Sequence, residues 1–132
     1  MSKIRILMID DNVNLIEMVR EYFKDHNKIE LAIESHDGED GLNKILNSAG
    51  NYDVILLDLI MPVKDGLYVL EELKKRGIEK NIIVETSYNE PKIIRKVSEY
   101  GVNYYVLKPF NLSDLEDKIL SVFDTQESKT IN

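Results

Sequence analysis

The hydrophobic pattern of this chain changes period repeatedly, and this alternation limits the fold more than any other feature. Residues 4–9 form a continuous apolar run interrupted only by Arg5, which predicts a strand buried on both faces. Runs of this kind predict five strands, at residues 4–9, 29–33, 54–57, 82–84 and 104–107. Apolar residues at helical spacing lie between and after them, around residues 15–23, 41–46, 66–76, 91–97 and 112–120.

Five strand–helix alternations in one short chain predict an α/β fold with an open parallel sheet and helices on both faces. Right-handed crossovers then give a doubly wound, five-stranded, flavodoxin-like sheet of order 2-1-3-4-5 with five helices. Ser113 and Glu116 have the spacing of a capping box, which predicts the start of the last helix there. The 132 residues fit one domain, expected at 1–123, and we expect 124–132 to be a disordered tail or the start of a linker.

Composition excludes several classes of function. The chain has no cysteine, so neither disulfides nor thiolate metal sites are available. Its net charge of −7, with 24 acidic and 17 basic residues, argues against nucleic-acid binding by this chain itself. The same acidity serves solubility or steers cations and basic partners, and the sequence leaves both open. Neither a signal peptide nor a membrane span is predicted, so we expect a cytoplasmic protein and no membrane partner.

Polar residues follow four of the predicted strands. Asp10 and Asp11 come after the first, Asp58 after the third, Thr86 after the fourth and Lys108 after the fifth. Because ligands of such sheets bind at the carboxyl ends of the strands, near the point where the strand order reverses, these side chains are expected to converge.

Three carboxylates in one pocket repel one another, by roughly 4 kcal/mol per pair about 4 Å apart at an effective dielectric constant near 20. A hard cation with oxygen ligands removes that cost, so Mg²⁺ (or Mn²⁺) is predicted at Asp10, Asp11 and Asp58. A carboxylate can act as the nucleophile in phosphoryl transfer, while Lys108 and the cation neutralise the transferring oxygens. Thr86 is placed to donate a hydrogen bond to a phosphate oxygen.

These motifs resemble the receiver domain of two-component response regulators. The matching pieces are IDDN, LLDLIMPVKDG, ETS and GVNYYVLKPF, and the resemblance covers about residues 3–122. Within that family, DLIMPVKDGLYVLEEL and YVLKPF are most similar to the sporulation master regulators of endospore-forming bacteria. The resemblance implies a signalling switch rather than an enzyme, which controls transcription, with sporulation as one such output, through a domain absent here. A stand-alone receiver that acts as a phosphorelay intermediate is the alternative.

The resemblance also assigns roles to individual positions. It implies that a sensor histidine kinase or histidine phosphotransferase phosphorylates Asp58. The sequence leaves the oligomeric state open, with a homodimer that forms on phosphorylation as one possibility. The cation is held by Asp10, Asp11, Asp58 and the backbone carbonyl of Ile60, and Lys108 pairs with the phosphate. Thr86 and Tyr105 form the switch that transmits phosphorylation to the surface of the fourth helix, last strand and last helix.

Two positions depart from the commonest family pattern. Ser87 stands where a small residue, often alanine, is usual, and it remains small. Glu85 stands where the residue before the switch threonine is usually apolar. If its strand is central, a carboxylate there needs either a partner or an exposed orientation.

Three other functions are compatible with the same fold. A Mg²⁺-dependent phosphatase usually carries its nucleophile in a DxD pattern after the first strand, whereas this chain has Asp10-Asp11-Asn12. A flavin or nucleotide binder needs a loop there rich in Gly, Ser or Thr. A module that keeps the fold without being phosphorylated would not need the complete set of site residues.

Overall fold

A computed structural model describes residues 2–131 of the chain, with side chains described as far as residue 124. One parallel sheet has the strand order β2-β1-β3-β4-β5, as predicted. Its strands are β1 (Ile4–Ile9), β2 (Ile29–Ser35), β3 (Val54–Asp58), β4 (Ile82–Thr86) and β5 (Tyr104–Leu107). The helices are α1 (Val13–Phe23), α2 (Gly38–Asn47), α3 (Gly66–Lys75), α4 (Pro91–Ser98) and α5 (Leu112–Ile131).

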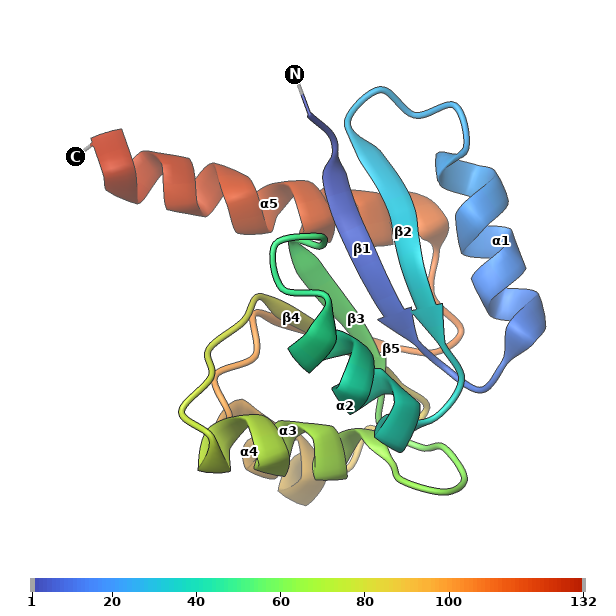
Figure 1. Cartoon of the computed structure of the whole chain (residues 1–132), viewed down its shortest axis with the longest axis vertical. Helices are drawn as coiled ribbons and strands as arrows, with labels where there is room; N and C mark the ends of the chain where they lie inside the picture. The colour runs from blue at the N-terminus through green and yellow to red at the C-terminus, as the bar shows by residue number, and fades with distance from the viewer. Residues whose placement is uncertain (1, 132) are drawn as a thin grey trace.

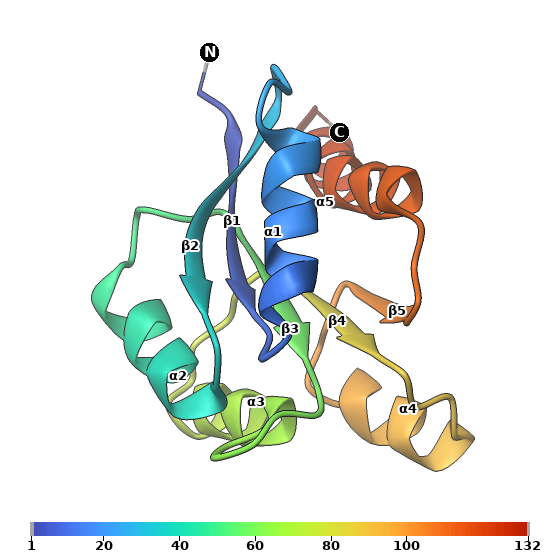
Figure 2. The same cartoon turned by 90° about the vertical axis from the view of Figure 1, so that its right-hand side faces the viewer.

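The helices cover the sheet from both sides, as the two views in Figures 1 and 2 show. Helices α1 and α5 lie on one face, and α2, α3 and α4 lie on the other. Alternate residues of each central strand therefore enter two separate apolar layers. On the α1–α5 face, Met8, Leu56 and Ile83 occupy matching positions of β1, β3 and β4. This packing fixes the sheet register, which decides what stands at the strand ends.

Three loops at the carboxyl edge of the sheet end in capped helices. Asn12, Asp37 and Asp65 each accept a hydrogen bond from a backbone N–H in the first turn of α1, α2 and α3, respectively. Such caps satisfy backbone donors that a helix start otherwise leaves unpaired. The loops after β1, β2 and β3 are thus fixed at their far ends.

The start of α5 differs from the prediction. The side-chain oxygen of Asn111 accepts from the backbone N–H groups of Ser113 and Asp114, so Asn111 is the cap and the Ser113–Glu116 capping box is wrong. Asparagine is as good a cap as serine, and it stands directly before the first apolar residue of the helix. The α5 backbone continues to Ile131. The sequence predicted a disordered tail or the start of a linker at residues 124–132. Side chains beyond residue 124 lie outside the described residues, so this domain boundary stays a prediction.

None of the helices within residues 2–131 combines the length and the apolar character that crossing a membrane requires.

Candidate functional site

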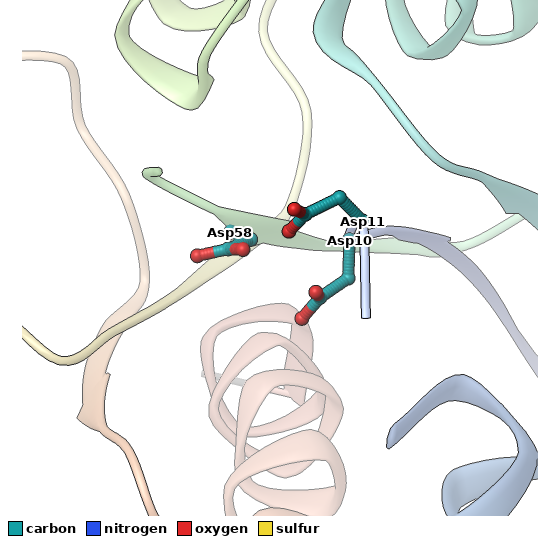
Figure 3. Close-up of side chains that lie close together, drawn as sticks. All are labelled: Asp10, Asp11 and Asp58. Atoms are coloured by element: carbon teal, nitrogen blue, oxygen red, sulfur yellow. The ribbon is translucent and has the colours of Figure 1, made fainter. Parts of the chain in front are cut away.

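Asp10, directly after β1, lies in a row with Asp58 of β3 and Glu85 of β4. Asp58 pairs in register with Glu85, and Asp10 directly follows the register pair Ile9–Leu57. All three are buried, whereas neighbouring Asp11 is exposed. Figure 3 shows Asp10 and Asp11 from the end of β1 beside Asp58 from the end of β3. Carboxylate oxygens of Asp10, Asp11 and Asp58 lie within 4.8 Å of one another. The structure therefore brings the three predicted acids together.

Lys108 reaches back over this row from just beyond β5. Its backbone N–H donates to the carbonyl of Thr86, at 2.8 Å, which fixes where the side chain starts. Its Nζ lies 2.9 Å from Oδ2 of Asp10 and 3.3 Å from Oδ2 of Asp58. Although burial opposes the charged form, the hydrogen bond to Asp10 and the nearby carboxylates raise the pKa of Lys108. The site thus contains a permanent cation in contact with two of its acids.

The environments of Asp10 and Asp58 push their pKa values apart. Burial, together with the Asp10 charge, raises the pKa of Asp58 to about 6, against the opposing effect of Lys108. Burial alone would also raise the pKa of Asp10, but interactions with the Glu85 carboxyl, the Asn12 N–H and Lys108 lower it. The Asn12 N–H donates to Asp10 at 2.8 Å, and the Ile60 N–H donates to Asp58 at 3.2 Å. The hydrogen bonds and positive charge around Asp10 therefore outweigh the cost of burying its carboxylate, whereas those around Asp58 do not.

Glu85 is the member of the row that the sequence prediction did not include among the site residues. Its strand is central and its side chain is fully buried, so the exposed orientation is excluded. As a carboxylate it finds no hydrogen-bond donor among the described residues for either oxygen, and Lys108 Nζ lies 3.9 Å from Oε1. Burial, together with neighbouring Asp10, raises the pKa of Glu85 well above its usual value. One feature of the sequence could have indicated its burial. Glu85 comes two residues after Ile83, so both side chains lie on the same face of β4.

The loop after Asp58 is held close to the site by a residue that has no side chain. A Cβ on Gly66 would lie 2.4 Å from the carbonyl oxygen of Asp58, so glycine is required for this approach. The Gly66 N–H donates to the carbonyl of Leu59 at 3.1 Å. In the same loop Val63 is 70% exposed and has a φ of 71°, which is strained for a β-branched residue.

The predicted switch residues are connected through the β4–α4 loop. Thr86 is fully buried at the end of β4, and its hydroxyl oxygen accepts from the Tyr88 N–H at 3.2 Å. The hydroxyl of half-buried Tyr105 donates to the carbonyl of Tyr88 at 2.5 Å. One residue of the loop therefore links both side chains.

Two hollows flank different ends of the sheet. The larger, of about 880 Å³, lies away from the acids at the amino ends of β3 and β4, beside Tyr52, Lys80 and Tyr100. A smaller one of about 170 Å³ lies between the loops after β3 and β4, where Ile60 and Tyr88 both contribute to its wall. Apolar side chains thus border the loops next to Asp58.

The acid cluster suits a hard divalent cation. It offers three carboxylates from two strand ends, one of them exposed to solvent. Burial and the neighbouring Asp10 charge raise the pKa of Asp58, so added positive charge would favour its ionised form. Mg²⁺ favours sites with a few carboxylates and room for water and phosphate. The Ile60 carbonyl, predicted as a further ligand, belongs to the residue whose N–H contacts Asp58.

A sequence model described as the response regulator receiver domain matches residues 6–120. Among solved structures, the receiver domain of a Francisella response regulator has a TM-score of 0.83 and 24% identity, covering 94% of this chain and 99% of its own. A DNA-binding response regulator of the LuxR family from Staphylococcus aureus has a TM-score of 0.79 and 27% identity, covering 90% and 98%. A CheX–CheY–BeF3–Mg complex from Borrelia burgdorferi contains a chain with a TM-score of 0.82 and 22% identity, covering 91% and 89%.

Proposed function

Because the chain belongs to the response regulator receiver domain family, we propose that it is switched by transfer of a phosphoryl group from a phospho-histidine donor to Asp58. Receiver domains are signalling switches that interact with histidine kinases or phosphotransferases. In the proposed step an oxygen of Asp58 attacks phosphorus, the phosphorus–nitrogen bond breaks, and the imidazole leaves with the bonding electrons. The observation that supports this most directly is the Lys108 ammonium in contact with Asp58 beside two further acids.

In this proposal Asp10, Asp11, Asp58 and the backbone carbonyl of Ile60 hold Mg²⁺ or Mn²⁺. The cation supplies neutralisation of charge on the transferring oxygens, which is most of what phosphoryl transfer requires. Lys108 stabilises the same oxygens from the other side, and its pKa is raised, so it stays charged at neutral pH. The raised pKa of Asp58 indicates that its ionised, nucleophilic form gains from added positive charge.

The link through Tyr88 suggests how the signal leaves the site. If the Thr86 hydroxyl turns to a phosphate oxygen, its hydrogen bond from the Tyr88 N–H is lost, and the carbonyl that holds Tyr105 becomes free to move. Moving a two-state equilibrium from 1:99 to 99:1 takes roughly 5.5 kcal/mol, and a hydrogen bond to a charged group contributes about 1.5–3 kcal/mol. Thr86 alone is therefore insufficient, whereas Thr86 and Lys108 together approach the required free energy.

The proposed readout is the surface formed by α4, β5 and α5, to which Tyr105 belongs. A phosphorylation-dependent homodimer would form through it, and transcription would be controlled through a domain beyond this sequence. Sporulation is the specific output that the motif resemblance suggests, and a stand-alone relay intermediate is the alternative. A cytoplasmic location is part of the same proposal.

Phosphorylation with a small-molecule donor tests the core of this proposal. The full chain is incubated with acetyl phosphate and Mg²⁺, and incorporation is followed by intact-protein mass spectrometry. Wild type and Asp25→Asn, which changes an exposed acid outside the site, should gain a phosphoryl group, and Asp58→Asn should gain none. Incorporation into Asp58→Asn, or no divalent-cation binding by wild type at about millimolar concentration, would refute it.

A further inference from the structure

Glu85 is a fully buried acid of the site for which the proposed phosphorylation gives no role. It lies on an interior strand, in register with Asp58, and neither of its oxygens accepts a hydrogen bond from a donor among the described residues. A buried polar group without a partner is costly, and a native structure that keeps one calls for a reason. The Lys108 ammonium lies 3.9 Å from its Oε1.

Lys108 contacts two of the carboxylates that a cation at this site would use. Its Nζ contacts Oδ2 of Asp10 and Oδ2 of Asp58, which are two of the three proposed cation ligands. An ammonium and a divalent cation repel each other, so Lys108 must weaken or give up these contacts when a cation binds. Its side chain is only 21% exposed, so water cannot replace the lost acceptors fully. The lysine therefore needs another acceptor within reach.

We propose that Glu85 is this acceptor, a positioning residue that holds the Lys108 ammonium inside the site while a cation occupies Asp10 and Asp58. Only a small movement is required, because hydrogen bonds form at about 2.7–3.2 Å and the present separation is 3.9 Å. A carboxyl oxygen accepts whether the group is ionised or neutral, so the role does not depend on the charge of Glu85. Lys108 stays next to the place where a phosphoryl oxygen would arrive.

This inference rests on the proposed cation site and makes a specific prediction about cation affinity. In Glu85→Leu the cation must displace Lys108 into a position without an acceptor, and its affinity should fall about tenfold or more. In Glu85→Gln the amide oxygen still accepts from Lys108, so affinity should remain within about threefold of wild type. Since the effect acts through the lysine, Glu85→Leu should change little in a Lys108→Met background.

Isothermal titration calorimetry of the full, unphosphorylated chain with Mn²⁺ measures these affinities directly. Wild type is compared with Glu85→Gln, Glu85→Leu, Lys108→Met and the double variant Glu85→Leu, Lys108→Met. Circular dichroism confirms that each variant is folded. Glu85→Met is a second apolar replacement should the leucine variant fail to fold. Tenfold weakening in the apolar variant, rescue by glutamine and no effect without Lys108 would establish the role.

Three results would overturn the inference while leaving the proposed function intact. The apolar variant could bind Mn²⁺ as wild type does, which would show that Glu85 is not needed. Glutamine could weaken binding as much as leucine, which would make the charge, and not the acceptor, responsible. Equal weakening in the Lys108→Met background would show that Glu85 does not act through the lysine. Failure of wild type to bind Mn²⁺ would instead refute the cation site itself.

Discussion

Replacing Asp58 with asparagine is expected to stabilise the cation-free protein at neutral pH. Burial beside Asp10 raises the pKa of Asp58 from 3.8 to about 6, so the folded state binds the proton more tightly than the unfolded state does. The contribution of this group to stability is therefore complete below about pH 4 and is lost as the pH rises through about 6. Asparagine cannot ionise and avoids that loss.

The size of the effect follows from the same shift. Each pKa unit is worth about 1.4 kcal/mol, so a rise from 3.8 to about 6 sets an upper limit of about 3 kcal/mol above pH 6. This upper limit already includes the ion pair with Lys108, whose Nζ lies 3.3 Å from Asp58, and asparagine does not match the shape and hydrogen bonding of a protonated carboxyl fully. We therefore expect a gain in the free energy of unfolding of about 1–2 kcal/mol at about pH 7.5, falling towards zero at about pH 4.

Urea unfolding in EDTA, followed by far-ultraviolet circular dichroism because the chain has no tryptophan, measures this difference. Asp11→Asn is the matched control, since it removes an exposed carboxylate of the same cluster and should change stability by less than about 0.5 kcal/mol. Saturating Mg²⁺ should reverse the order, because wild type gains a ligand-binding contribution that Asp58→Asn partly loses. A variant that is less stable than wild type in EDTA at every pH would refute the reasoning.

Further predictions concern the loops around the site. Val63→Asn should raise the free energy of unfolding by about 1 kcal/mol, because asparagine tolerates the left-handed conformation better than valine; unchanged or lower stability in urea unfolding would contradict this. Asn12→Ala should lower the free energy of unfolding by about 1 kcal/mol, because the Leu15 N–H loses its capping acceptor. A loss below about 0.3 kcal/mol in urea unfolding would contradict this prediction. The double variant Ile60→Asn, Tyr88→Glu should lose the acyl phosphate faster than wild type, because these apolar and aromatic residues, 40% and 46% exposed, cannot orient an attacking water. Faster decay of the wild-type phosphoprotein would count against that idea.

The alternation of buried strands and amphipathic helices was readable along the chain because it is a local pattern. Continuous apolar runs such as 54–57 mark strands covered on both faces, and the observed strand order agrees with the prediction. The predicted strand ends were less accurate. The strands β3 and β4 extend through the polar residues Asp58 and Thr86, which a search for apolar runs leaves outside the strand. The prediction of the α5 cap was wrong because Asn111 and Ser113 are both good capping residues, and the sequence does not show which of them caps the helix.

The sequence by itself determined that Asp10, Asp11, Asp58 and Lys108 would meet, because parallel strands bring their carboxyl ends to one edge of the sheet. Only the tertiary structure decided that Glu85 is buried within reach of Lys108. It also decided that the loop after β4 links the two predicted switch residues. These contacts depend on which residues of neighbouring strands stand side by side and on how far one long side chain reaches. The pattern along a single strand shows which face a residue takes, whereas packing across the sheet decides which residues of other strands it meets.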